Sequence, residues 1–441
     1  MKCFLSWLTL SAALSTSCMS YRARPLSAEA SSAAFAGRSL SDPGLRQFLA
    51  EQKAGQGAWG VNRLALAATY FHPDVALARA EADEMAAAIK TAKQRPNPIF
   101  TFGPQYASFQ RNNLTPWFLA GNVFYQIETA GKRTRRTEQA LAAAEAARWR
   151  VSARAWAARS RVRAAMLELH SARENIRLLE TEQRLHDEAI KKLTAQMEAG
   201  DVSPFELTQA RLALNRTRLA LQDAQRLAAT GEARLAAAVG VPLSALKSVS
   251  LDFSSFTRLP AQSTSSSRRL ALTQRADLMA LLADYAAAES ALRLEYAKQY
   301  PDVRLGPGFD YNQGQNRWQL GVSFELPING NRGPIAQAEA KRKSAEARFL
   351  AQQDTIQGEL NIALAAYEAS RKKAQTAASL SQEAGAAAGT TKRMVEAGEL
   401  SPLELTRRQI EASTANLARM AAEIEAQTAA GALEDAMQAR L

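Results

Sequence analysis

Three segments of the chain alternate apolar and polar residues with a period of two, the pattern of a β-strand with two unlike faces, and a fourth segment, residues 99–107, does so more weakly. In residues 117–128, Trp117, Val123 and Tyr125 share one face and Asn122 lies on the other. Runs of about 10 residues with one apolar and one polar face are typical of transmembrane strands. A soluble sheet with one solvated face has the same period, so alternation alone leaves that alternative open. The predicted strands are residues 99–107, 117–128, 303–312 and 318–326.

The polar positions of these segments indicate a water-filled lumen. Four strands cannot close a barrel, and an open strand edge finds no hydrogen-bond partners in lipid. Two copies of the chain would give eight strands and a filled interior, whereas three would give twelve and leave a conduit. We therefore expect a homotrimer. The residues expected to face the lumen are Asn122, Gln126, Arg304, Asp310, Gln319 and Glu325.

A helical pattern occupies most of the remaining chain, and its most distinctive part occurs twice. Residues 199–212 read AGDVSPFELTQARL, and residues 397–410 read AGELSPLELTRRQI. In each copy a glycine can end one helix, and a serine followed by proline can begin the next. The glutamate three residues after Ser203 and Ser401 completes a capping box. Each copy therefore predicts a tight helix–turn–helix hairpin, and the chain is a tandem duplication.

The helix lengths predict a long tunnel. Residues 131–199 and 334–397 would each form a helix roughly 100 Å long. Each long helix is matched by two shorter ones stacked end to end, predicted at residues 74–94, 204–239, 273–298 and 402–437. We expect a mainly α fold with membrane β. Duplicated long helical hairpins form a periplasmic tunnel, and four strands per chain contribute to a trimeric twelve-stranded β-barrel.

The start of the chain predicts export. Its apolar run is too short to span a membrane and is typical of a signal peptide, at residues 1–17. Small residues before Cys18 resemble a lipoprotein cleavage site, which would make Cys18 an acylated first residue; cleavage by ordinary signal peptidase is the alternative. The expected divisions are an N-terminal periplasmic segment, a first repeat, a connector around the waist and a second repeat, at residues 18–72, 73–240, 241–272 and 273–441.

The formal net charge of +12 does not indicate binding to nucleic acid. Arginine and lysine are interleaved with glutamate and alanine along the helices, which is the composition of solvated helix faces. The densest basic cluster, at residues 132–136, directly follows a predicted membrane strand. We therefore expect it to form a basic collar against the anionic head groups of outer-membrane lipid.

No catalytic or cofactor motif accompanies this architecture. The three histidines, His72, His170 and His186, form no metalloprotease motif, and the sequence has no Cys-x-x-Cys pair and no glycine-rich phosphate loop. His170 and His186 would lie roughly 24 Å apart along one helix, too far to share a metal ion. We predict that the protein is not an enzyme and that it holds no cofactor or metal.

Several runs of the sequence resemble the TolC-type outer-membrane efflux proteins. They are Trp59 and residues 67–74, 78–80, 96–98, 126–133, 325–333 and 336–340. Within that family they are most similar to the CzcC-like branch of heavy-metal cation efflux systems. The resemblance implies a passive trimeric exit duct, with a periplasmic adaptor and an inner-membrane RND-type pump as partners. Heavy-metal cations are the expected cargo. The alternatives are a duct for drugs or other small molecules, in multidrug efflux or type I secretion, and an autonomous porin.

The resemblance also assigns roles to the hairpin tips. An adaptor is expected to dock at Gly200, Asp201, Val202, Ser203, Gly398, Glu399, Leu400 and Ser401. In TolC-like proteins an acidic ring closes the tunnel just inside the tips, and Glu404 falls at that position. Arg407 stands where the family carries a second acid, and we expect it to pair with Glu404 or with a neighbouring chain. The alternative is that Glu404 only caps its helix, as Glu206 would in the first copy.

Overall fold

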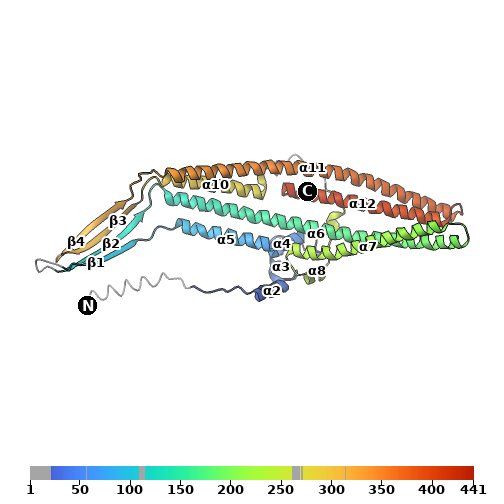
Figure 1. The fold of residues 1–441 in the computed structure, drawn as a ribbon, viewed down its shortest axis with the longest axis horizontal. Helices are drawn as coiled ribbons and strands as arrows, with labels where there is room; N and C mark the ends of the chain where they lie inside the picture. Colours follow the sequence, from blue (N-terminus) through green and yellow to red (C-terminus); the bar gives the residue numbers. More distant parts are fainter. Residues whose placement is uncertain (1–20, 56, 109–114, 261–268, 270–271, 313) are drawn as a thin grey trace.

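Two very long helices run along the molecule. The computed structural model describes residues 21–55, 57–108, 115–260, 269, 272–312 and 314–441. α6 (Lys132–Glu198) has 67 residues, and α11 (Arg332–Glu396) has 65. In Figure 1 the sheet lies at one end of these helices and the two hairpin turns lie at the other. Among the described residues, no helix is both long and apolar enough to cross a membrane.

Each long helix is accompanied by two shorter helices placed end to end (Figure 1). Beside α6 run α5 (Pro73–Lys93) and α7 (Pro204–Val239). Beside α11 run α10 (Ala276–Ala297) and α12 (Pro402–Met437). The stacking that the helix lengths predicted is therefore present in both repeats.

Hydrogen bonds hold the ends of the stacked helices together. Where α7 meets α5, the Arg38 guanidinium donates to the carbonyl oxygens of Phe71 and Gly240 at 3.1 and 2.8 Å. Gly240 ends α7 with a φ of 84°, and a Cβ there would lie 2.9 Å from the Phe71 carbonyl oxygen, so the junction requires glycine. Where α12 meets α10, the Gln438 side chain accepts a hydrogen bond from the N–H of Ala276 at 2.9 Å.

The described parts of the N-terminal segment and of the connector lie at the middle of the helical body, together with a large apolar core. Leu64, Met166 and Leu235 are fully buried in it. Trp59 and Leu251 form a parallel bridge that joins the two segments. The short helical elements here are α2 (Ala28–Ala36), α3 (Pro43–Glu51), α4 (Val61–Phe71), α8 (Leu243–Lys247) and the 3-10 turn η1 (Ser254–Phe256).

The strands form one antiparallel sheet in the order β1-β2-β3-β4. They are β1 (Ile99–Tyr106), β2 (Trp117–Ile127), β3 (Val303–Asn312) and β4 (Gln315–Phe324). The two repeats meet through β2 and β3, where Gln126 lies opposite Arg304. β4 begins before its predicted start at Trp318, because Gln315 already pairs with Asn312 of β3. The apolar alternation starts only at Trp318, so the sequence pattern missed this first part of the strand.

Candidate functional site

One face of the sheet is apolar and exposed along all four strands, and we call it the apolar face. Trp318 is 79% exposed, and Phe100 is 68% exposed. Soluble monomers rarely present a contiguous apolar surface of this extent, whereas strands in a bilayer do. The register places on this face Phe100, Phe102, Tyr106, Trp117, Leu119, Val123, Tyr125, Ile127, Val303, Leu305, Phe309, Tyr311, Trp318, Leu320, Val322 and Phe324.

The opposite face of the sheet, which we call the polar face, carries hydrogen-bonding side chains. The Gln319 amide donates to the side-chain oxygen of Asn122 at 3.4 Å. The two meet over Gly308, where a Cβ would come within 2.0 Å of the Asn122 oxygen. Five of the six residues expected in the lumen share this face, and Glu325 follows the end of β4; the five are Asn122, Gln126, Arg304, Asp310 and Gln319.

A buried ion pair joins the sheet to the helical body. Lys132, the first residue of α6, is only 8% exposed, and its ammonium donates to the Asp302 carboxylate and to the Tyr300 carbonyl oxygen, both at 2.6 Å. The N–H of Thr129 and the amide of Gln126 also donate to Asp302, at 3.1 and 3.0 Å. Burial opposes ionisation of Asp302, but these hydrogen bonds outweigh it and lower the pKa of the carboxyl.

The structure does not arrange the basic cluster at residues 132–136 as a uniform collar. Lys132 points inward to Asp302. Arg136 donates to both oxygens of the Glu128 carboxylate, at 2.6 and 3.2 Å. These carboxylates come from the strand ends, which the fold brings beside the start of α6. At these distances each carboxylate binds a basic side chain directly. Two of the four basic residues, Lys132 and Arg136, therefore hold the strand ends to the start of α6.

Both hairpin turns have the same backbone geometry. Gly200 and Gly398 have φ angles of 83° and 79°, a region that favours glycine. The N–H groups of Asp201 and Glu399 each donate to a carbonyl oxygen five residues back, at 2.9 Å. This is the hydrogen bonding of a Schellman motif, so each turn closes its long helix as the sequence predicted.

The predicted capping boxes form only in part. The hydroxyl of Ser401 accepts a hydrogen bond from the N–H of Glu404 at 3.3 Å. α7 begins at Pro204 without a side-chain bond from Ser203, so the capping prediction was wrong for this serine. Both serines have φ −74° and ψ 148°, which leaves the hydroxyl orientation as the difference. The paired glutamates, Glu206 and Glu404, contact arginines instead of the serine N–H groups.

The two residues expected at the gate have different partners from those predicted. Glu404 lies 3.2 Å from Arg408, which is one turn further along α12. Arg407 lies 3.2 Å from Glu206, at the start of α7. The expected pair between Arg407 and Glu404 was therefore wrong. The i,i+4 spacing favours Arg408 as the partner of Glu404, and Arg407 is left to join the two hairpins.

Apolar packing and one lysine also hold the tips together. Val202 packs partly against a small buried cluster, whereas Leu400 is 37% exposed. The Lys192 ammonium, from α6, donates to the hydroxyl of Thr406 on α12 at 2.6 Å. The two turns therefore form one surface. The buried members of the cluster are Ala189, Leu193, Leu207 and Leu403.

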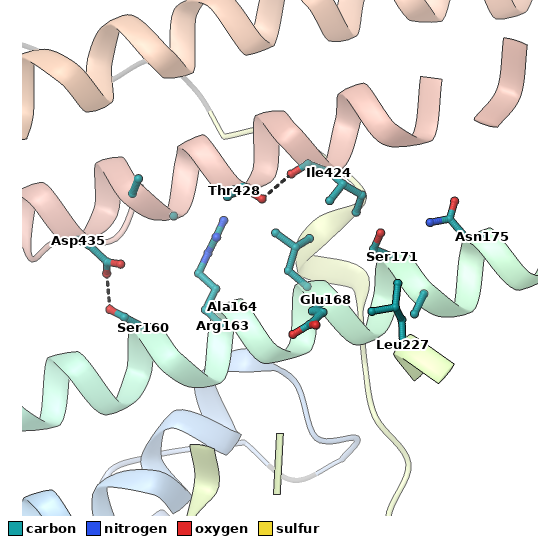
Figure 2. Close-up of a pocket in the computed structure, with 14 residues that line it drawn as sticks. Ser160, Arg163, Ala164, Glu168, Ser171, Asn175, Leu227, Ile424, Thr428 and Asp435 are labelled. Carbon is teal, nitrogen blue, oxygen red and sulfur yellow. Dashed lines mark hydrogen bonds between the residues drawn. The ribbon is translucent and has the colours of Figure 1, made fainter. Parts of the chain in front are cut away.

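A pocket of about 520 Å³ lies between α6 and α12 in the helical body. In Figure 2, Ser160 and Arg163 of α6 point toward α12, which supplies Asp435. Asp435 accepts hydrogen bonds from Ser160 and from the Trp156 indole, although burial raises the pKa of its carboxyl. Arg163 donates to the carbonyl oxygen of Gln427 at 2.9 Å. Asp435 and Arg163 therefore use these hydrogen bonds to join α6 to α12 across the pocket.

The surroundings of the three histidines indicate structural roles. His72 accepts a hydrogen bond from the N–H of Asp74 at the start of α5. His170 stacks on Phe253 with 5.3 Å between ring centroids, and burial lowers the pKa of the imidazole. His186 is buried on α6. Within the described ranges, no three His, Cys, Asp or Glu side chains are grouped so that they could hold a metal ion.

Comparisons with known proteins agree with this architecture. A family model described as outer membrane efflux protein matches residues 67–241 and 268–438. No curated protein matches the chain. The outer-membrane channel OprN is similar at a TM-score of 0.69 and 18% identity, over 95% of this chain and 98% of that one. Two further structures cover 86% of this chain at 18% identity. They are VceC of Vibrio cholerae (TM-score 0.69, 96% of that chain) and the CmeC outer membrane channel of Campylobacter jejuni (0.68, 85%).

The likeness to these channels shows a shared fold, and the family match covers most of both repeats. The expected fold class is confirmed: a mostly helical body with duplicated hairpins and four antiparallel strands. The broad family predicted from the sequence is confirmed as well. The chain therefore belongs to the outer membrane efflux protein family, whose members are channels of the outer membrane and not enzymes.

Proposed function

We propose that three copies of this chain assemble into the passive exit duct of a tripartite efflux pump. The observation that supports this most directly is the sheet edge: within the described residues, β1 and β4 each pair on one side only. Unpaired backbone groups are costly in lipid, so β4 of one copy would pair with β1 of the next. Twelve strands give a barrel with room for a conduit, lined by the polar face. A periplasmic adaptor and an inner-membrane RND-type pump are the proposed partners.

The detergent-solubilised protein is expected to be a stable particle of three chains, because only closure gives both edge strands a partner. Native mass spectrometry measures this directly. A sole species of one or two chains would contradict the proposed duct.

We propose heavy-metal cations as the cargo. The support is the set of sequence runs similar to the CzcC-like branch. The polar face carries charges of both signs, such as Arg304 and Asp310. Such a lining suits passage of a hydrated ion and leaves selectivity to the pump. Deleting the gene should raise sensitivity to divalent metal salts. Sensitivity confined to lipophilic drugs would favour the multidrug alternative.

We propose that residues 1–17 are a signal peptide and that Cys18 carries a lipid anchor. Both lie outside the described residues. The support is the small-residue run before Cys18 and the course of residues 21–27, which lead from α2 toward the sheet end (Figure 1). An N-terminus anchored in the outer membrane requires that direction. The mass of the mature N-terminal peptide tests the anchor, with Cys18→Ser as the unacylated reference.

We propose that the two hairpin tips dock the adaptor, and Leu400→Asp is expected to weaken this contact. Leu400 is an exposed apolar residue at the turn, and a charge at the centre of an interface is desolvated without a partner. Export should fall by about tenfold, while oligomer size and thermal unfolding stay unchanged. Leu243→Asp, at a site with the same 37% exposure on α8, is the control. Equal effects of the two substitutions, or loss of folding with Leu400→Asp, would argue against docking at the tips.

We propose that the starts of α7 and α12 form the gate, with Glu404 lining it and the Arg407–Glu206 pair holding it closed. Because both partners of that pair are about half exposed, it contributes roughly 0–1 kcal/mol. Arg407→Ala should therefore raise the leak conductance in planar bilayers, by up to about fivefold for each of the three pairs that the proposed trimer loses. Glu206→Ala should do the same, since it removes the same pair, and Glu404→Ala should reduce cation selectivity.

Arg408→Ala is the matched control for the gate, since it removes the same charge one residue away. Arg408 forms ion pairs with Glu404 and Glu411 on its own helix and, in the described part of the chain, none with α7. If Arg408→Ala opened the channel as much as Arg407→Ala, loss of charge alone would explain the leak. The pair between the hairpins would then have no part in closure.

A further inference from the structure

We propose that a membrane phospholipid binds with its phosphate between Arg95 and Arg133, at the rim where the apolar face ends. A cavity of about 320 Å³ lies there, between the segment that precedes β1, the end of β2 and the first turn of α6. Arg95, Tyr125, Ile127 and Arg133 are among its lining residues. The inference rests on the membrane placement of the sheet and does not depend on the cargo or the number of chains in the duct.

The two arginines that line the cavity have no protein partner in the described part of the chain. Of the basic side chains at residues 132–136, Lys132 bonds Asp302, Arg135 bonds Glu138 and Arg136 bonds Glu128. Arg133 has no such contact, and neither does Arg95, which precedes β1. The Glu128 carboxylate also lines the cavity, but Arg136 neutralises it. The cavity therefore keeps an excess of positive charge.

The apolar side of the cavity distinguishes a lipid from a free anion. Tyr125 and Ile127 line it, and both belong to the apolar face, where they are 38% and 46% exposed. Aromatic residues at the end of a membrane strand lie at the level of the lipid head groups. A guanidinium forms paired hydrogen bonds with phosphate oxygens. A phosphate on the arginines with its acyl chains along the apolar face would use both surfaces, whereas inorganic phosphate would use one.

The second repeat does not reproduce this arrangement. Arg133 is the second residue of α6, and the second residue of α11 is Gly333. Arg332, the first residue of α11, corresponds to Lys132, so the start of α11 offers no arginine at the position of Arg133. We expect one bound phospholipid for each chain, at the start of α6.

Native mass spectrometry of the purified full-length protein with added palmitoyl-oleoyl phosphatidylglycerol tests the proposal. The wild type should retain one lipid per chain. The Arg95→Gln/Arg133→Gln double variant should bind it about tenfold more weakly, because both charge-assisted contacts are lost. Arg135→Gln is the matched control. It removes the same charge from the same turn, but Arg135 is paired with Glu138 and does not line the cavity. It should bind lipid as the wild type does.

Further binding measurements distinguish recognition of the phosphate group from recognition of the acyl chains. Palmitoyl-oleoyl glycerol, which lacks the phosphate, should not be retained, and excess inorganic phosphate should not displace the phospholipid. Equal retention by the double variant, or of the phosphate-free lipid, would overturn the proposal. Displacement of the phospholipid by inorganic phosphate would show that the site binds an anion and does not recognise a lipid, which would also overturn the proposal. If the double variant fails to fold, Arg133→Lys keeps the charge and loses only the paired geometry, and unchanged retention by it would also count against the site. Because retention is counted per chain, the result does not depend on trimer formation.

Discussion

Val123→Arg and Leu320→Arg are each expected to destabilise the membrane-inserted protein by about 2–4 kcal/mol. Both side chains lie within the apolar face, on β2 and β4, and are 42% and 69% exposed in the single chain. In the bilayer that exposure becomes contact with acyl chains, where a guanidinium loses its hydration. The free energy of unfolding from lipid vesicles in urea measures the cost, and the amount of protein recovered in outer membranes provides a second measure.

Substitutions at the adjoining positions are the controls for these two. Asn122→Arg and Gln319→Arg add the same side chain one residue away in sequence, but on the polar face. They should cost less than about 1 kcal/mol, because a charge that faces a wet lumen keeps its water. Equal costs at all four positions would show that the two faces do not separate lipid from water.

The faces of the sheet could be predicted because a strand fixes them locally. With a period of two, the sequence of each segment determines which side chains share a face, whatever its partner strand. The observed register then places apolar residues opposite apolar residues: Val303 lies opposite Phe324, and Leu305 lies opposite Val322. Helix lengths and turn residues are equally local, which is why the hairpins and the stacked helices could also be predicted.

The partners of charged side chains could not be predicted, because they depend on which distant segments the fold brings together. Lys132 and Asp302 belong to different repeats, as do Arg407 and Glu206. In the sequence, Lys132 is one of several basic residues beside a membrane strand, which suggested lipid contact. The pairing of β2 with β3 places the strand end that supplies Asp302 beside Lys132. The partner of Arg407 at the hairpin tips could not be predicted for the same reason. Acidic residues lie near it on both α12 and α7, and it contacts Glu206 on α7.

Asp302→Asn is expected to destabilise the folded protein by about 3–5 kcal/mol, because it leaves the Lys132 ammonium buried without its counter-charge. Lys132 is 8% exposed and would keep only neutral acceptors, among them the Tyr300 carbonyl oxygen at 2.6 Å. The amide is nearly the same size as the carboxyl, so the change tests charge rather than packing. The free energy of unfolding in urea, measured in detergent, records the effect.

Glu138→Gln makes the same chemical change at the partner of Arg135, in an ion pair whose side chains are about 40% exposed. Solvent screens that pair, and the expected cost is at most about 0.5 kcal/mol. Replacing both members of the buried pair, with Lys132→Met and Asp302→Leu, should recover most of the stability lost in Asp302→Asn, because no charge is then left desolvated. If Asp302→Asn cost no more than Glu138→Gln, the Lys132 ammonium would have to reach water in the folded protein. The junction between sheet and tunnel would then depend on its backbone hydrogen bonds and apolar contacts instead of this charge pair.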